Sequence, residues 1–200
     1  MGYLIRKANE DDKHQIAHTI VYSLEDNFTG LSKSKDNLIK IFENGIDTQR
    51  FIVADLNGQI VGITGCADCS GRAMIINKKL CRKNLGFFRG MIAFMVFTEE
   101  FLHPLTSPIN IGYIDILGVL EEARRQGIAK AMLEKVVECN PGYDELILNT
   151  TDINLAAVKL YENFGFVEYE RKPYKWAKQA GFKEKIWMKY TKCFRIPRKR

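Results

Sequence analysis

The chain has 200 residues, of which 46% are hydrophobic and 27% are charged, and its formal net charge is +6. This length corresponds to one domain, or to one domain with an insertion, and the composition is typical of a globular protein. No run reaches the roughly 18 uncharged apolar residues of a membrane-spanning helix, and residues 1–12 lack the apolar core of a secretory signal, so we expect a cytoplasmic protein with no membrane contact.

The first part of the chain predicts a strand, two helices and a hairpin. Apolar residues recur at helical spacing from Asp11 onward, which favours an amphipathic helix. The pair Asn57-Gly58 lies between two apolar runs and predicts a tight antiparallel hairpin, because both central turn positions tolerate positive φ. The expected elements are a strand at 3–6, a helix from Asp11, a helix at 34–42, and strands at 50–55 and 59–66.

The middle of the chain is unusually apolar. Residues 84–102 carry a helical pattern rich in Phe and Met, and His103-Pro104 is expected to end that helix. This segment is longer than an ordinary connection between two elements, so we treat it as an insertion at about 84–104.

The second half alternates strands with helices. Pro141-Gly142 breaks the chain between two of these elements, and Gly165 is expected to end the last helix. This mixed order, with two strand–helix–strand crossovers, predicts an α/β layered domain around a partly parallel sheet. The expected elements are an extended run at 109–120, a helix at 124–138, a strand at 145–149, a helix at 154–164, and strands at 166–170 and 186–190.

Cysteines and the basic terminus set further expectations. The odd count of five cysteines favours reduced structural thiols, and Cys66-x-x-Cys69 has no second pair to complete a metal site, so no metal is expected. Residues 191–200 form a basic tail that could contact nucleic acid or an acidic membrane, but such a tail is more often a solvated terminus. Its cations are not interleaved with aromatic residues, so we expect no nucleic-acid partner.

The segment from Asp115 to Lys130 carries the chemistry. A strand runs into a short basic turn, and a helix begins at once. The first N–H groups of a helix have no intrahelical partner and bind phosphate well. Gly127 allows close approach of the backbone, and Arg124 and Arg125 can add charge-assisted bonds. The segment therefore predicts a pyrophosphate site, with a basic helix start and solvated arginines as the alternative.

Two motifs in this order resemble the GNAT acetyltransferase superfamily. Arg124-x-x-Gly127-x-Ala129 matches the Q/R-x-x-G-x-G/A motif, and Leu117-Gly-Val119 resembles the strand segment before it. Asn154-x-x-Ala157-x-x-x-Tyr161, followed by Asn163-Phe-Gly-Phe166, resembles a second family signature. The opening at residues 5–12 is also similar. Glu121 departs from the family pattern, since many members have proline there.

The resemblance implies a GNAT fold that binds acetyl-coenzyme A (acetyl-CoA). This fold is α/β, with a mixed sheet of about six to seven strands and helices on both faces. The cofactor lies where two parallel strands, here 114–120 and 145–149, splay apart. Residues 1–190 would form one domain with the helical insertion, followed by the tail at 191–200.

The resemblance also implies which residues bind the cofactor. The pantetheine arm would contact the backbone of Leu117, Gly118 and Val119, and it would also contact Asn154 and Ala157. The alternative for Asn154 is a helix N-cap. The N–H near Val119 would polarise the thioester carbonyl. The pyrophosphate is expected at Arg124, Arg125, Gln126, Gly127, Ile128, Ala129 and Lys130.

For catalysis, the resemblance assigns Tyr161 as the general acid that protonates the leaving thiolate, in a direct attack within a ternary complex. The alternative is a core aromatic. Asp115 is the first candidate for the base, because strand alternation places it on the face of Leu117, although it could instead be a buried carboxylate that organises the pocket. Tyr113 and Glu121 are weaker candidates for the base.

The acceptor is expected to be a primary amine of a small molecule or a protein. The alternative function is a CoA-binding module without catalysis. The insertion is interpreted as a lid over the acceptor side, or as a helix that extends the core or forms a dimer face.

Overall fold

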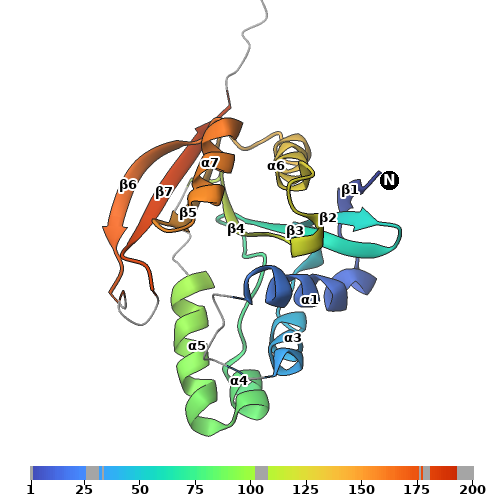
Figure 1. The fold of residues 1–200 in the computed structure, drawn as a ribbon, viewed down its shortest axis with the longest axis vertical. Helices are drawn as coiled ribbons and strands as arrows, with labels where there is room; N and C mark the ends of the chain where they lie inside the picture. The colour runs from blue at the N-terminus through green and yellow to red at the C-terminus, as the bar shows by residue number, and fades with distance from the viewer. Residues whose placement is uncertain are drawn as a thin grey trace, which may run out of the picture.

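The computed structural model describes residues 2–25, 32, 34–101, 108–175, 177 and 181–192, without the side chains of 99–101 (Figure 1). The expected helix stop at His103-Pro104 and residues 193–200 of the basic tail lie outside the described residues. Within the described part, no helix is both long and apolar enough to cross a bilayer.

A seven-stranded mixed sheet forms the centre of the molecule, as the sequence predicts. Its strand order is β1-β2-β3-β4-β5-β7-β6. The pair β4–β5 is parallel and the other five neighbouring pairs are antiparallel. The strands are β1 (Leu4–Lys7), β2 (Phe51–Leu56), β3 (Gln59–Ala67), β4 (Ile111–Val119), β5 (Glu145–Thr151), β6 (Val167–Pro173) and β7 (Glu184–Thr191).

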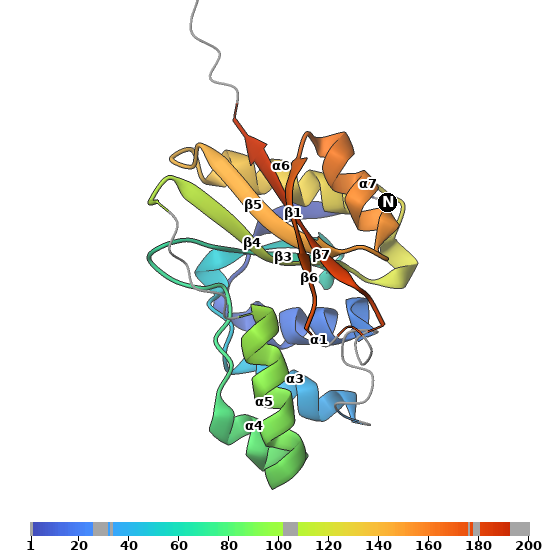
Figure 2. The same cartoon turned by 90° about the vertical axis from the view of Figure 1, so that its left-hand side faces the viewer.

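Helices cover both faces of this sheet. Figure 1 shows α6 and α7 on one side of the sheet, and α1 with α3 on the other. The pair α4–α5 projects away from the sheet beyond α3 (Figure 2). The described helices are α1 (Lys13–Ser23), α3 (Lys35–Glu43), α4 (Lys78–Leu85), α5 (Phe87–Phe101), α6 (Ile128–Cys139) and α7 (Leu155–Phe164), with 3-10 turns η1 (Glu10–Asp12), η2 (Thr48–Arg50) and η3 (Glu121–Ala123).

Two hydrophobic cores lie on the two faces. The first joins α1, α3, α4 and α5 to the sheet, and Phe42 and Phe97 meet in it at a ring distance of 5.0 Å. The second lies under α6 and α7 and includes Met132, Leu133 and Tyr161. The sheet therefore separates the insertion from the helix that begins at the predicted phosphate turn.

Local turn chemistry explains several element ends. Asn57 and Gly58 both have positive φ, 55° and 88°, which confirms the tight hairpin between β2 and β3. Gly165 has φ 110° directly after α7, as expected of a C-terminal glycine. Asn154 accepts a hydrogen bond from the Ala157 N–H and caps the start of α7.

Two expected boundaries are wrong. The helix predicted from Arg124 begins at Ile128, because residues 124–127 form a turn with left-handed positions. The insertion is not one helix from residue 84 but two helices, α4 and α5, separated by Gly86 with φ 81°. The pattern of α4, KKLCRKNL, is amphipathic: Leu80, Cys81 and Leu85 pack into the first core, and Lys79, Arg82 and Lys83 are exposed.

Candidate active site

The two parallel strands separate as the sequence predicts. Strands β4 and β5 pair only over residues 111–113 and 145–147. Beyond this point β4 continues along β3 as far as Val119, and β5 continues along β7 as far as Thr151. A gap therefore opens between β4 and β5 toward their carboxyl ends, and the strand edges that face it have no β-partner there.

The turn between η3 and α6 lies at the end of β4. Arg125 has φ 62° and Gly127 has φ 80°, so two of its residues adopt the left-handed conformation. No side chain caps α6, and its first internal bond runs from the Ala131 N–H to the Gly127 carbonyl. The N–H groups of the first helical turn are thus available, and alternating backbone conformations of this kind form anion-binding concavities.

Gly127 is required by its conformation rather than by crowding. A Cβ on Gly127 would have only the Tyr3 hydroxyl within 4 Å, at 3.7 Å. A side chain at this φ is nevertheless strained by about 1–2 kcal/mol. The turn therefore leaves open space over its N–H groups, which is what an approaching phosphate needs.

The structure places the Arg124 side chain differently from the expectation. Its Nε donates to the Val119 carbonyl at 3.1 Å, and its Nη2 donates to the Ser23 carbonyl at 3.2 Å. The guanidinium thus ties the end of α1 to the end of β4 and shapes the turn. Within the described residues, no hydrogen bond or ion pair holds the guanidinium of Arg125, so that side chain remains available to a phosphate.

Ser23 is a residue near the site that sequence reasoning missed. A Cβ on Gly118 would lie 2.1 Å from the Ser23 Oγ, so only glycine lets α1 approach β4 here. The Ser23 hydroxyl is buried and has no hydrogen-bond partner in the described structure. No local sequence signal marks Ser23, because its position depends on packing between α1 and β4.

Tyr161 lies on α7 in the second core, where its ring packs edge-on against Phe166 at 5.7 Å. Burial raises the pKa of Tyr161 to about 12. The phenol is therefore protonated at neutral pH, as a proton donor must be. Asn154 is the N-cap of the same helix, and its side chain accepts a hydrogen bond from the Ala157 N–H. The structure therefore shows the capping role that was the alternative for Asn154.

Asp115 is not on the face of Leu117, so that expectation is wrong. The β3–β4 register shifts between Gly65 and Cys66, and Asp115 is the β4 residue left without a partner. Its carboxylate accepts from the Ala73 N–H at 3.2 Å and pairs with Arg72 at 3.4 Å, and its side chain is 5% exposed. The bulge breaks the alternation of the strand. Burial raises the pKa of Asp115 to about 6.

Polar and aromatic side chains gather where the strands part. The Asn149 amide donates to the Tyr113 hydroxyl across the opening gap, and the Tyr113 ring lies 6.0 Å from that of Trp187. Their strand neighbours Leu148 and Met188 point into the second core, so alternation places Asn149 and Trp187 on the opposite face. This face lies away from α6 and α7.

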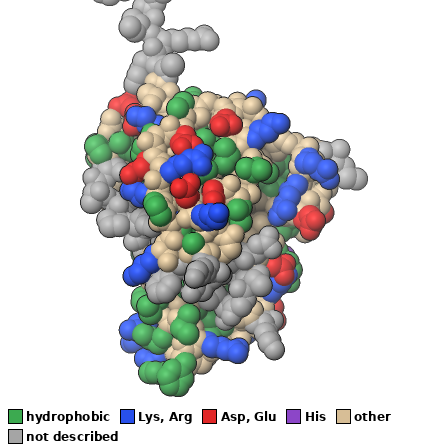
Figure 3. All heavy atoms as spheres, turned by 60° about the vertical axis from the view of Figure 1, so that its left-hand side comes forward, with side chains coloured by type: hydrophobic (Ala, Val, Ile, Leu, Met, Phe, Trp, Pro, Cys, Tyr) green, Lys and Arg blue, Asp and Glu red, His purple; other side chains and the backbone are tan. Residues whose placement is uncertain are grey.

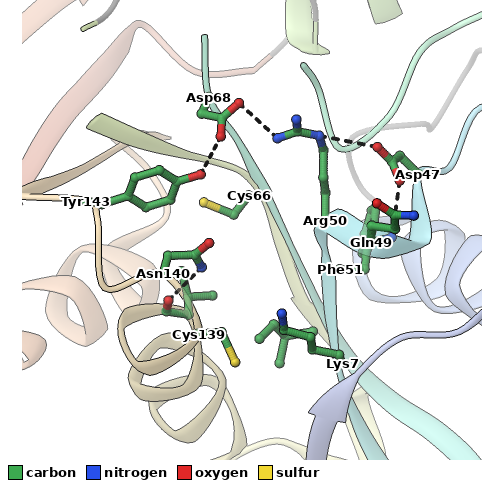
Figure 4. Close-up of a pocket in the computed structure, with 12 residues that line it drawn as sticks. Lys7, Asp47, Gln49, Arg50, Phe51, Cys66, Asp68, Cys139, Asn140 and Tyr143 are labelled. Atoms are coloured by element: carbon green, nitrogen blue, oxygen red, sulfur yellow. Dashed lines mark hydrogen bonds and ion pairs between the residues drawn. The ribbon is translucent and has the colours of Figure 1, made fainter. Parts of the chain in front are cut away.

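A separate pocket of about 210 Å³ lies at the other end of α6, away from the turn (Figure 4). Arg50, Asp68 and Tyr143 form a bonded network in it, with Arg50–Asp68 at 3.1 Å and Tyr143–Asp68 at 2.7 Å. Burial raises the pKa of the Cys66 thiol in its wall to about 12, so this cysteine stays protonated. The polar groups of Arg50, Asp68 and Tyr143 are hydrogen-bonded within this network. The pocket lies apart from the gap between β4 and β5.

Comparison with known proteins identifies the family to which the chain belongs. The sequence pattern of the Acetyltransferase (GNAT) family matches residues 17–166. The chain is also 39% identical over 62 residues to N-alpha-acetyltransferase 30 of Schizosaccharomyces pombe, which is 30% of this chain and 41% of that protein. The chain thus spans less than half the length of this curated relative.

Solved structures share the fold. An N-acetyltransferase from Staphylococcus aureus Mu50 superposes with a TM-score of 0.64 at 16% identity, covering 94% of this chain and all of that one. The NatC complex bound to Gag peptide and CoA has a chain that superposes with a TM-score of 0.60 at 18% identity, covering 96% of this chain and all of that one. At these identities the likeness concerns the fold alone.

Proposed function

The chain belongs to the GNAT acetyltransferase family, and we propose that it transfers the acetyl group of acetyl-CoA to a primary amine. The proposal rests on two features that adjoin each other, the gap between β4 and β5 and the start of α6. The gap between β4 and β5 leads directly to an uncapped helix start whose N–H groups are open. One feature suits an extended amide-bearing arm, and the other suits the pyrophosphate at the end of that arm.

Backbone groups supply most of the proposed cofactor contacts. The free edge of β4 at Leu117–Val119 pairs with the amides of the pantetheine arm as a neighbouring strand would. The N–H groups from Gln126 to Lys130 bind the pyrophosphate, with the Arg125 side chain beside them. Arg124 acts indirectly, because its guanidinium holds Val119 and Ser23 in place.

Acetyl-CoA supplies the thioester carbonyl that the amine attacks. Tyr161 holds a proton at its phenol oxygen and gives it to the leaving sulfur; its raised pKa keeps the phenol protonated until the thiolate forms beside it. The backbone N–H groups at the free edge of β4 stabilise the negative charge that develops on the carbonyl oxygen.

Tyr113 is better placed than Asp115 to receive the proton of the amine. Its hydroxyl lies beside the gap, where it accepts a hydrogen bond from the Asn149 amide, on the face away from α6 and α7. Asp115 is held by Arg72 and by the Ala73 N–H, and it has little contact with solvent. We therefore assign proton relay to Tyr113, and we assign the positioning of the segment after β3 to Asp115.

The α-amino group of a protein is the acceptor that we favour. The support is the name of the relative from S. pombe, an N-alpha-acetyltransferase, over the 62 matched residues. The separation of β4 from β5 suits an extended N-terminus that pairs along a strand edge. We also propose that residues 1–190 act as one catalytic domain, with the insertion beginning at Lys78 rather than at residue 84.

The proposal is tested by acetylation of a library of N-terminal peptides, monitored by thiol release and by mass spectrometry. The wild type should acetylate a subset of free N-termini and ignore peptides with blocked N-termini. Tyr161→Phe should lower kcat about 100-fold with little change in KM, because a positioned acid contributes roughly that factor. The matched variant Tyr169→Phe removes an exposed phenol on β6 and should keep full activity.

If the wild type binds acetyl-CoA but transfers acetyl to neither peptides nor small amines, the transferase proposal is wrong. If it acetylates only small amines, the transferase proposal stands and the protein acceptor is wrong. These two results are distinguishable in the same assay.

A further inference from the structure

Two segments of the chain carry basic residues without acidic ones: the tail at 191–200, with five Lys and Arg residues, and residues 69–98. Residues 69–98 contain six Lys and Arg residues and no Asp or Glu. The whole chain has 30 basic and 24 acidic residues, so the other 170 residues contain 24 of each and are neutral overall. Residues 69–98 lead into and form most of α4 and α5, and Glu99 and Glu100 follow them near the end of α5.

Most of these cations have no acidic partner. Arg72 is paired with Asp115, but in the described structure no ion pair holds Lys78, Lys79, Arg82 or Lys83. Arg82 instead lies over the Phe87 ring at 4.2 Å. Lys79, Arg82, Lys83 and Phe87 line one shallow, open hollow on the surface of the pair. Three cations around an open hollow attract an anionic group such as a phosphate.

The outer face of α5 beside this hollow is apolar and uncovered. The inner face of the helix packs into the first core through Ala93 and Phe97. The exposed side of α5 therefore presents apolar residues to solvent, with the exposed Arg89 among them. Figure 3 shows the hydrophobic side chains of this end of the molecule with basic ones beside them. The exposed fractions are Phe88 80%, Met95 62%, Phe87 57%, Ile92 57% and Val96 36%.

We propose that the α4–α5 pair docks on the surface of an anionic phospholipid bilayer. Phe88, Ile92 and Met95 enter the boundary between headgroups and acyl chains, and the hollow at Arg82 and Lys83 takes a lipid phosphate. An interfacial helix combines an apolar face with Lys and Arg in this way. With 15 residues, α5 is too short to span the roughly 30 Å of hydrocarbon, so it lies in the plane of the surface.

Charge decides between this partner and a second copy of the chain. Two copies that met through the α4–α5 pair would bring two hollows lined by Lys79, Arg82 and Lys83 together, and like charges in a contact are repulsive. A bilayer with anionic lipids offers both the negative charge and the apolar layer that this surface lacks. The pair projects from the sheet, so it can reach a flat surface without covering the gap between β4 and β5 (Figure 2).

The test is co-sedimentation of the full chain with phosphatidylcholine vesicles, with and without phosphatidylserine. The wild type should bind the anionic vesicles, bind the neutral ones much more weakly, and lose binding as salt is added. Arg82→Glu/Lys83→Glu should weaken binding at least about thirtyfold, since each basic residue near the surface contributes about fivefold. Ile92→Ser/Met95→Ser removes exposed apolar groups and should weaken binding by about tenfold or more.

Lys172→Glu/Lys189→Glu is the matched control. It reverses two exposed cations on β6 and β7 and should bind as the wild type does. Thermal unfolding of each variant shows that the fold is retained. A Phe88→Trp variant adds a reporter whose emission should shift to the blue on anionic vesicles, against the background of the two native tryptophans.

Binding by both α4–α5 variants equal to that of the wild type would overturn the proposal, and the basic tail would then account for the attraction. A wild type that binds neither kind of vesicle would also overturn it, and an acidic protein would be the partner to seek. Equal binding to neutral and anionic vesicles would contradict the role of the cations.

Discussion

The turn at residues 124–130 and the α4–α5 pair both present positive charge, but they produce it in different ways. The turn uses backbone N–H groups that two left-handed residues and an uncapped helix start leave open. The helix pair uses the side chains of Lys79, Arg82 and Lys83 beside exposed apolar residues. The turn depends on its backbone conformation, whereas the helix pair depends on which side chains it carries.

This difference has a consequence for specificity. Fixed N–H groups in a concave turn suit one phosphate geometry, whereas lysines and arginines on a projecting helix suit a diffuse anionic surface. The two regions also differ in their attachment. The turn joins β4 to α6 within the sheet, while the pair is held to the domain by the first core, with Phe97 against Phe42.

Asp115 connects the two regions. It lies on β4, four residues before Val119, and its carboxylate holds Arg72 and the Ala73 N–H in the segment that leads from β3 to α4. A change at Asp115 can therefore affect both regions, whereas changes within either region should stay local.

The largest effect that separates the regions is expected from Phe97→Ala. This ring is 1% exposed, and its removal leaves a cavity between α5 and α3 that should cost about 3–5 kcal/mol of unfolding free energy. Affinity for acetyl-CoA, measured on the folded fraction, should be unchanged. Phe88→Ala, on the exposed side of the same helix, should cost less than about 0.5 kcal/mol. A loss of cofactor affinity in Phe97→Ala would show that the regions are coupled.

Asp115→Asn should change how the free energy of unfolding depends on pH. The pKa of Asp115 rises from its ordinary value of 3.8 to about 6 on folding. Between these values the folded state holds a proton that the unfolded state has lost, so stability falls as pH rises. The wild type should lose about 3 kcal/mol relative to Asp115→Asn between pH 3.5 and pH 7. Urea unfolding of both proteins across this range measures the difference, and parallel curves would contradict the assignment.

Gly127→Asp should affect the turn alone. A left-handed residue with a side chain is strained, and its carboxylate would face the phosphates, so acetyl-CoA affinity should fall about 100-fold. Isothermal titration measures this loss. Gly142→Asp adds the same charge at a glycine whose Cβ would meet nothing within 4 Å, and it should bind normally. Normal binding by Gly127→Asp would remove the turn from the cofactor site.

The smallest expected effect concerns the start of α4. The Asn77 side chain accepts from the Lys79 and Leu80 N–H groups at 2.9 Å and 3.3 Å. Asn77→Ala should cost about 1 kcal/mol of unfolding free energy, as the loss of an N-cap typically does. It should leave acetyl-CoA affinity unchanged, and a small fall in vesicle binding would show that the order of α4 matters to docking.

Features encoded by a few neighbouring residues followed from the sequence. The hairpin at Asn57-Gly58 and the glycine end of α7 were each predicted, because left-handed positions select their residues locally. The layered α/β architecture and the separation of β4 from β5 also followed, from the strand–helix order and from the two motifs that match the family.

Other features were decided only in three dimensions. The bulge in β4 turned Asp115 toward Ala73, and alternation along one strand cannot reveal a register shift against another. The Arg124 guanidinium bonds to the carbonyl of Ser23, 101 positions away, and α4 begins at Lys78, before the segment that the sequence predicted to be helical. Local backbone preferences act between neighbours and can be inferred from sequence, whereas these contacts form only when distant segments pack together and each buried polar group finds a partner.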